Sequence, residues 1–378
     1  MEYNEGEMKK LTILIYSLAS GGAERVVSIL LKELSQKYEI ELVLMRDVIF
    51  YDIPKNVKII ILENSNPNEN GIFKLLKLPF LAYKYSKIKS DISISFMNRP
   101  NYINVLSNLF KKSKTIISER IAPSQEYKNN TLKDKISKYL IKTLYKKSDV
   151  IVPNSKYIAY ELEKIFNVST NKIKVIYNPV FKPQTSNLKP QTSKFIFIHI
   201  GRMEEQKNHN LLIESFKKTN LNAELWLIGD GYLREDLESR VKELGLVDKI
   251  KFLGRQKDVF KFLNQADCFV FSSNYEGFPN VLLEALSCNL PIISTDCKSG
   301  PREILAPNSD ILKQTDDIEI AEYGILTKVE SIDSMKKAMR LMYENKELRY
   351  NFKNKAQNRL KEFEIDKIMK EWERIICK

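Results

Sequence analysis

Short runs of apolar, β-branched residues recur along the chain, and most are followed by a segment with helical spacing of its apolar positions. In the first half these runs predict strands near residues 11–18, 40–45, 57–62, 92–96, 114–118 and 149–152. In the second half they predict strands near residues 195–200, 223–228, 250–253, 268–271 and 291–294. Strands that alternate with helices indicate parallel sheets covered on both faces, which is a doubly wound α/β organisation.

The chain divides at a segment rich in proline and polar residues. With 378 residues it is longer than a typical single core allows. The composition of the segment that ends at Ser193 predicts a linker at 181–193, between an N-terminal domain, 1–180, and a second domain, 194–360. The apolar spacing within 361–378 predicts a terminal helix.

The N-terminal apolar run has two interpretations. Lys9 and Lys10 followed by residues 11–19 imitate a secretory signal, but Glu2, Glu5 and Glu7 are unfavourable before such a run. A buried first strand explains it better. No apolar run approaches the ~18 residues that predict a transmembrane helix.

The most informative segment is Tyr275–Leu286, which holds two carboxylates eight residues apart around a Gly-Phe-Pro turn. Pro279 suits the first position of a helix, and the amides that follow form a natural phosphate site. Glu276 lies before this helix and Glu284 lies about one and a half turns inside it. Two acceptors around an anion site suit a sugar nucleotide. The alternative is that both are ordinary solvated residues, but the apolar surroundings make an unpaired carboxylate costly.

A second loop follows the strand predicted at 195–200. Gly201–His209 carries Arg202 and Lys207 into the crevice at the carboxyl end of that strand, where open α/β sheets bind ligands. Arg supplies a planar fork for phosphate oxygens, and Lys supplies a mobile charge. Plain solvation of both side chains is the alternative.

These features together resemble the retaining glycosyltransferases of family 4, over essentially the whole chain. The matching residues are Gly21-Gly22-Ala23-Glu24 after the first strand, Arg202, Lys207, and the Glu276–Glu284 pair. The resemblance implies a GT-B fold of two facing Rossmann-like domains with a central cleft. It also implies roles: Arg202 and Lys207 bind the donor diphosphate, Glu276 contacts the transferred sugar, and Glu284 holds the ribose. The glycine loop, Gly21 and Gly22, would line the cleft, and the terminal helix would return to the first domain. The remaining donor-binding candidates are Gly277, Phe278, Pro279 and Asn280.

Four segments are similar to the N-acetylgalactosaminyltransferases of bacterial general N-glycosylation. They are Ile15–Val27, Leu78–Ala82, Asn98–Ile103 and Lys298–Glu303. This similarity implies transfer of GalNAc, through an α-1,4 linkage, from UDP-GalNAc to a glycan carried on undecaprenyl diphosphate.

One departure from the family concerns histidine. Many members carry a histidine near the acceptor, within the segment that reads Ser118–Ile121 here, and Arg120 occupies that region instead. The two histidines of the chain, His199 and His209, lie in the second half, His199 near a strand end and His209 opening a helix. A mechanism that needs an N-terminal histidine base is excluded. Front-side transfer, in which the leaving phosphate takes the acceptor proton, stays open.

The excess of basic over acidic residues is confined to the N-terminal domain. Residues 1–190 hold 31 Lys and Arg against 18 Asp and Glu, whereas residues 191–378 hold 30 of each. Segments 73–89 and 133–147 mix lysines with apolar residues, which favours contact with an anionic membrane surface over a merely solvated face. No nucleic-acid recognition motif accompanies the charge, so nucleic acid is not expected as a partner.

The sequence therefore predicts a cytoplasmic enzyme at the inner face of the cell membrane that transfers a sugar from UDP-N-acetylhexosamine to a polyprenyl-diphosphate-linked glycan. No catalytic metal and no cofactor are expected. The four cysteines lack metal-type spacing and are expected to be reduced and packed as small apolar side chains. The alternatives are transfer of another hexose in capsule or lipopolysaccharide assembly, a UDP-sugar 2-epimerase on the same fold, and a non-catalytic lipid-surface protein.

Overall fold

The computed structural model describes residues 8–19, 21–64, 69–180 and 194–377. The predicted linker, 181–193, lies outside these residues. The chain forms two compact units, one of Met1–Asn178 together with Asp366–Lys378 and one of Pro179–Ile365. Most strands of both sheets are those that the apolar runs predict.

The N-terminal unit contains a six-stranded parallel sheet in the order β3-β2-β1-β4-β5-β6. All six predicted strands are confirmed: β1 (Lys10–Ile15), β2 (Glu39–Leu44), β3 (Lys58–Ile61), β4 (Ile92–Phe96), β5 (Lys114–Glu119) and β6 (Val150–Pro153). Strand β1 lies inside the sheet and its residues 11–15 are fully buried, which explains the continuous apolar run.

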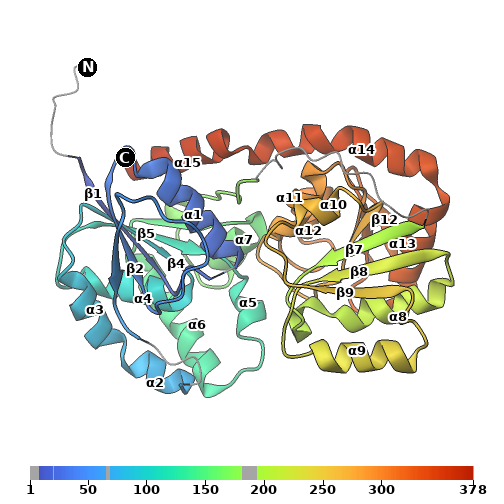
Figure 1. Cartoon of the computed structure of the whole chain (residues 1–378). Helices are drawn as coiled ribbons and strands as arrows, with labels where there is room; N and C mark the ends of the chain where they lie inside the picture. Colours follow the sequence, from blue (N-terminus) through green and yellow to red (C-terminus); the bar gives the residue numbers. More distant parts are fainter. Residues whose placement is uncertain (1–7, 20, 65–68, 181–193, 378) are drawn as a thin grey trace. The chain divides into compact units, whose positions relative to one another are not determined.

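Helices cover both faces of this sheet. They are α1 (Gly22–Leu34), α2 (Gly71–Leu76), α3 (Leu78–Ser86), α4 (Asn98–Ser107), α5 (Pro123–Glu126), α6 (Leu132–Leu144), α7 (Lys156–Lys164) and α15 (Ile365–Cys377). Figure 1 shows α1 and α15 over one face and α3, α4 and α6 over the other. Leu14, Val43, Ile117 and Ile151 of the strands form one core with the second group of helices.

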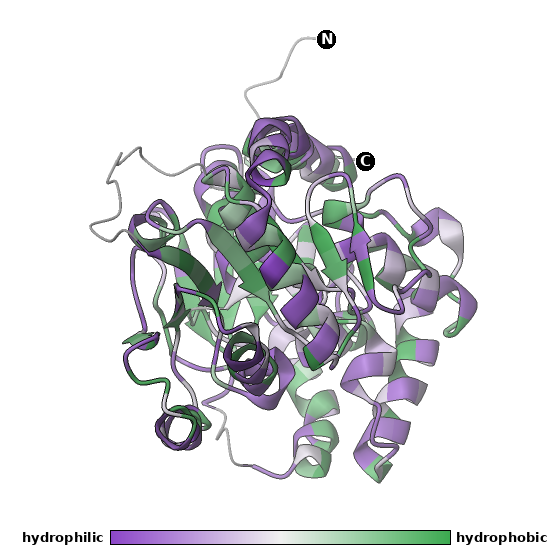
Figure 2. Ribbon diagram, turned by 90° about the vertical axis from the view of Figure 1, so that its right-hand side faces the viewer, coloured by the Kyte–Doolittle hydropathy of each residue, from purple (hydrophilic) through white to green (hydrophobic). Residues whose placement is uncertain are grey.

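The terminal helix α15 packs on the N-terminal sheet through one apolar stripe. Its buried residues are Ile368, Met369, Trp372 and Ile376, which share one side of the helix. The ring of Trp372 lies 5.8 Å from that of Phe96 in β4. In Figure 2 the strands are mostly green and the helices are banded in green and purple, as this one-sided burial requires.

The second unit contains a seven-stranded sheet in the order β12-β13-β11-β10-β7-β8-β9. Its strands are β7 (Phe195–Ile200), β8 (Ala223–Ile228), β9 (Ile250–Gly254), β10 (Cys268–Phe271), β11 (Ile292–Thr295), β12 (Ile318–Ile320) and β13 (Ile325–Thr327). The first five were predicted. The last two were missed because each has three residues, too few to show a period, and β12 pairs antiparallel at the sheet edge.

The helices of the second unit also lie on both faces of its sheet (Figure 1). They are α8 (His209–Thr219), α9 (Arg234–Glu243), α10 (Phe260–Leu263), α11 (Asn280–Ser287), α12 (Pro301–Leu305), α13 (Ile332–Glu344) and α14 (Lys346–Leu360). Helices α8, α9 and α13 bury Phe216, Leu237 and Met339 against Leu225 and Ile293 of the sheet. Helix α11 packs with α14.

No helix within the described part of the chain is long and apolar enough to span a membrane. All four cysteines are free thiols. Cys268 and Cys297 are buried as expected, but Cys377 is exposed, so the expectation of a packed side chain is wrong there. It lies on the last turn of α15, where the apolar stripe ends.

Candidate functional site

The sheet of the second unit has a topological switch point between β7 and β10. From β7 the chain adds β8 and β9 on one side, and it then returns to place β10, β11 and β13 on the other. Ligands of open α/β sheets bind beyond the carboxyl ends of the two strands where the direction reverses. The loops after β7 and β10 carry the predicted site residues.

Lys207 and Glu276 meet at this switch point. Lys207 Nζ lies 2.5 Å from Glu276 Oε1, and the two side chains are only 15 % and 10 % exposed. The Ser272 side chain donates to the Lys207 carbonyl, and the Gln206 side chain donates to the Tyr275 carbonyl, so side-chain hydrogen bonds also tie each loop to the backbone of the other. Glu276 is therefore not a solvated surface residue.

Arg202 follows the same strand but has a different environment. Its side chain is 67 % exposed and pairs with Glu204 at 3.1 Å. The structure thus places Arg202 in the predicted loop without joining it to the pair of Lys207 and Glu276. Its role at the diphosphate stays a prediction.

Helix α11 begins one residue later than predicted. Pro279 is its N-cap, with φ of −75° and ψ of 105°, and Asn280 is the first helical residue. The fixed φ of proline suits the extended cap as well as the first turn, which explains the one-residue difference. Glu284 lies in the second turn and is 5 % exposed, which excludes the interpretation of an ordinary surface residue. Phe278 is also buried, and its ring lies 5.6 Å from that of Phe363.

The segment Ser299–Gly300 supports the turn before α11. Ser299 donates a hydrogen bond to the Gly277 carbonyl. Gly300 has a φ of +93°, and a Cβ atom at this position would lie 2.4 Å from Pro279 Cδ and 3.1 Å from the Gly277 carbonyl oxygen. Sequence reasoning did not give Gly300 this role, although the Ser-Gly-Pro triplet is a turn signal.

We expect Gly300→Ala to weaken donor binding more than it destabilises the protein as a whole. The new methyl group overlaps Pro279 and the backbone conformation is one that L residues rarely adopt, which together displace the turn. The check is the affinity for UDP by calorimetry, together with the melting temperature. The control is Gly245→Ala, since Gly245 has a φ of +67° but nothing within 4 Å of the added Cβ. Unchanged UDP affinity in the Gly300 variant would show that this segment does not hold the turn.

Arg302, which sequence reasoning also missed, anchors the helix that follows Gly300. It is 4 % exposed and donates to both carboxylate oxygens of Asp296 and to both of Glu319. A buried arginine that bridges two carboxylates fixes the start of α12, and so fixes the loop behind the α11 turn.

The two histidines lie behind Lys207 and are neutral at pH 7. His209 is the first residue of α8, as predicted, and His199 lies in β7, where its Nδ1 is 2.9 Å from the Val270 carbonyl oxygen. Burial lowers the pKa of His199 to about 4 and also lowers the pKa of His209. Neither therefore adds positive charge to the site.

Gly21 and Gly22 lie in the N-terminal unit, where Gly22 opens α1 and Gly21 is its N-cap. They follow the carboxyl end of β1, which is at the switch point of that sheet, between β1 and β4. Their place in a donor site stays a prediction. Among the residues that the structure describes, no cluster of three or more His, Cys, Asp or Glu could hold a metal ion.

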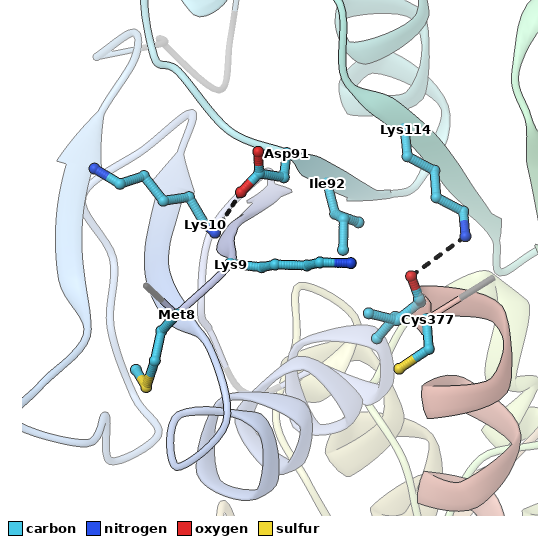
Figure 3. Close-up of a pocket in the computed structure, with 8 residues that line it drawn as sticks. Met8, Lys9, Lys10, Asp91, Ile92, Lys114 and Cys377 are labelled. Carbon is cyan, nitrogen blue, oxygen red and sulfur yellow. Dashed lines mark hydrogen bonds between the residues drawn. The ribbon is translucent and has the colours of Figure 1, made fainter. Parts of the chain in front are cut away.

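Figure 3 shows a cavity of about 480 Å³ at the opposite, amino edge of the N-terminal sheet. It is lined by Lys9, Lys10, Asp91 and Lys114, with Cys377 from α15. Lys114 donates to the carbonyls of Ile375 and Ile376, so it caps the end of α15. We assign this cavity a structural role, because ligands of such sheets bind at the other edge.

Comparisons with known proteins identify the family of this chain. The model "Glycosyltransferase Family 4" matches residues 20–181, and "Glycosyl transferases group 1" matches residues 181–359. The chain is 39 % identical over 373 residues, 96 % of this chain and 98 % of the relative, to the Campylobacter jejuni N-acetylgalactosamine-N,N'-diacetylbacillosaminyl-diphospho-undecaprenol 4-alpha-N-acetylgalactosaminyltransferase. It is 29 % identical over 381 residues, 98 % of this chain and 99 % of the relative, to a second Campylobacter jejuni α-1,4-N-acetyl-D-galactosaminyltransferase.

A solved structure of Anabaena HepE in complex with UDP superposes with a TM-score of 0.76 at 17 % identity, covering 97 % of this chain and 99 % of that one. A likeness at this identity shows the fold, and it confirms the predicted GT-B class. The family models and the Campylobacter relatives show more. The chain belongs to glycosyltransferase family 4 and is a hexosyltransferase.

Proposed function

We propose that this chain transfers GalNAc from UDP-GalNAc to an undecaprenyl-diphosphate-linked oligosaccharide in protein N-glycosylation, with retention of configuration and an α-1,4 linkage. The name of the relative that is 39 % identical along 96 % of the chain describes a 4-alpha transfer of N-acetylgalactosamine to a diphospho-undecaprenol-linked acceptor. The protein would work at the cytoplasmic face of the cell membrane, where the lipid presents its glycan.

The observation that carries the proposal is the pair of Lys207 and Glu276 at the switch point. In the absence of a donor, the ammonium group and the carboxylate neutralise each other at 2.5 Å. When a sugar nucleotide binds, Lys207 turns to the diphosphate and Glu276 becomes available to hydroxyl groups of the transferred sugar. Arg202 is long and exposed enough to reach the same diphosphate.

The chemistry would then come from positioning and charge stabilisation. Lys207, Arg202 and the N-terminal amides of α11 oppose the charge that grows on the leaving diphosphate, so no metal is needed. The leaving phosphate oxygen takes the proton of the attacking hydroxyl on the same face of the sugar.

We expect substitutions of Glu276 and Glu284 to have different effects. Glu284→Gln should raise the Kd for UDP and leave kcat nearly unchanged, because ribose contacts persist from the ground state to the transition state. Glu276→Gln should lower kcat and reduce the discrimination between donor sugars. Calorimetry with UDP and steady-state kinetics with two donors measure both effects. A Glu284 variant with native affinity for UDP would refute the assignment of Glu284 as the residue that binds the ribose.

The N-terminal unit has an exposed surface suited to a membrane. The segment 73–89 contributes to two helices, α2 and α3. Phe73, Leu76 and Phe80 are 61–68 % exposed, whereas Leu78, Leu81 and Tyr85 face the core. Lys87 and Lys89, which follow the end of α3, are also exposed. An exposed apolar patch bordered by lysines is typical of an interfacial membrane contact. We call Phe73, Leu76 and Phe80 the apolar patch.

The test of the function is a donor screen with a short-chain prenyl diphosphate that carries the two N-acetylated sugars, followed by mass and linkage analysis of the product. We expect one or more added N-acetylhexosamines with UDP-GalNAc. Addition of a plain hexose would support capsule or lipopolysaccharide assembly instead. Conversion of the UDP-sugar by the protein alone, without an acceptor, would identify a 2-epimerase.

A further inference from the structure

The end of α14 and the segment after it lie against the turn that precedes α11. Helix α14 packs along α11 in the second unit (Figure 1), and a 3₁₀ turn, Lys361–Phe363, follows α14. Phe363 is fully buried, and its ring lies 5.6 Å from the ring of Phe278. Phe278 is the middle residue of the turn at 277–279, two positions after Glu276. Phe363 therefore helps to fix where this turn lies.

Arg359 holds a second element that supports the same turn. Its side chain is 2 % exposed, and its Nε and Nη2 donate to the carbonyl oxygens of Ile304 and Glu303, at 2.8 and 2.7 Å. These carbonyls lie near the end of α12, so the guanidinium caps this short helix. Helix α12 begins directly after Gly300, where a Cβ atom would overlap Pro279. Arg359 thus acts on the turn through α12.

Arg359 and Phe363 also contact each other. The guanidinium lies 4.5 Å over the Phe363 ring, and its Nη1 pairs with Glu362 at 2.7 Å. A buried arginine that is stacked on a ring and hydrogen-bonded to backbone carbonyls is held in one conformation, because its loss would leave those acceptors unsatisfied. We call Arg359 and Phe363 the α14 brace.

The brace lies where the chain passes between the two units. The chain leaves the first unit after Asn178 and returns to it at Asp366. The backbone N–H of Val180 donates to the Phe363 carbonyl at 2.8 Å, and Val180 also forms an isolated parallel bridge with Glu364. The two connecting segments, 178–180 and 363–366, are therefore paired with each other at the residue whose ring contacts Phe278.

The position of the turn matters to the candidate donor site. Glu276 and the first N–H groups of α11 flank the turn, so a shift of the turn moves both. A misplacement of about 1 Å can lower the rate of an enzyme by roughly 100-fold. Loop and element-terminal residues such as 178–180 and 363–366 are also the kind that absorb conformational change.

We propose that Arg359 and Phe363 are positioning residues of the donor site, which hold the turn at 277–279 against the paired connecting segments. Nucleotide binding at the turn and the order of these segments then depend on each other. The inference rests on the proposed function, because it takes this turn to be part of the donor site.

The first test compares two arginines of α14. Arg359→Gln should raise the Kd for UDP by about tenfold, because the hydrogen bonds that cap α12 are lost. The matched control is Arg349→Gln. Arg349 also donates to backbone carbonyls, those of Met342 and Tyr343 in α13, and its guanidinium lies 5.2 Å over the Phe195 ring. Because these contacts hold α13 rather than α12, this variant should keep the Kd within about twofold of native.

The second test compares two phenylalanines. Phe363→Leu removes the ring but keeps an apolar side chain, and it should also raise the Kd for UDP by about tenfold. Its control is Phe352→Leu, since Phe352 of α14 is 4 % exposed and packs in the core that α8, α9 and α13 share with the sheet. Arg359→Lys should recover part of the affinity, because it keeps a charge near the Phe363 ring. Melting temperatures of all variants are measured, because loss of stability alone should affect the controls as much as the brace.

Hydrogen exchange followed by mass spectrometry tests the link to the connecting segments. In the native protein and in both controls, UDP should slow the exchange of the peptides that contain Val180 and Phe363. In Arg359→Gln and Phe363→Leu at saturating UDP, this slowing should be largely lost, although the nucleotide is bound. A purely structural residue would not separate binding from this response.

Three outcomes would overturn the inference. Native UDP affinity in both brace variants, with only lower melting temperatures, would make these residues purely structural. UDP binding to the native protein without slower exchange at Val180 would remove the link, while the proposed function would stand. A native protein that binds no UDP would overturn both. Since these measurements use UDP without a sugar or an acceptor, their result does not depend on which sugar the donor screen identifies.

Discussion

Replacing Lys207 by alanine should lower kcat by about 100- to 1000-fold, because a preorganised contact to the leaving diphosphate is lost. Lys207 lies at the switch point and its ammonium group is held at 2.5 Å by Glu276 before any donor arrives. Steady-state kinetics with the short-chain acceptor measure the effect. Arg202→Ala should act in the same direction.

The matched control for Lys207 is Lys337→Ala, which removes a lysine of the same unit. Lys337 pairs with Asp317 at 2.6 Å, but both side chains are about half exposed. Exposed pairs contribute little to stability, so this variant should keep native activity. The Lys207 variant leaves the buried Glu276 without this partner, so its melting temperature is measured as well. A folded Lys207→Ala variant with near-native kcat would remove this residue from the site.

Replacing the apolar patch by serine should release the protein from anionic vesicles. Each large apolar side chain that enters a membrane interface contributes up to about 1.5–3 kcal/mol. Losing Phe73, Leu76 and Phe80 together is therefore expected to weaken vesicle binding by roughly 100-fold or more. The three side chains are 61–68 % exposed, so the fold should persist. Sedimentation with anionic vesicles measures the binding.

The control for the apolar patch replaces equally exposed apolar residues of the second unit. Tyr232, Val247 and Tyr350 are 57–69 % exposed, and their triple serine variant should bind vesicles like the native protein. Activity of the patch variant on the water-soluble acceptor should survive, because the proposed donor residues Lys207 and Glu276 lie in the other unit. Equal vesicle binding by the patch variant and the native protein would show that this surface is only solvated. Added salt should weaken native binding in part, through Lys87 and Lys89.

The strands and the motif loops followed directly from the sequence. A strand covered on both faces is expected to be almost continuously apolar, so runs such as 11–15 and 195–200 predict strands from the sequence alone. Lys207 was identified because it follows such a strand, at the edge where open α/β sheets bind ligands. Glu276 was identified because it lies just before the turn at Pro279 that opens a helix, eight residues ahead of Glu284. The three-residue strands β12 and β13 carry no period of their own, since pairing at the sheet edge decides them.

Contacts between residues distant in the chain were decided by the tertiary structure. Gly300 must be glycine because a Cβ atom at this position would overlap Pro279, which no local pattern shows. Arg120 stood in the sequence as the replacement for a histidine, but its burial and its unsatisfied donors appeared only when β5, Phe96 and Asn178 came together. The sequence by itself determined the α/β architecture, the family and the candidate donor motif, because periodicity and strand-end loops are local. Burial and pairing of single polar groups depend on neighbours that only the fold supplies.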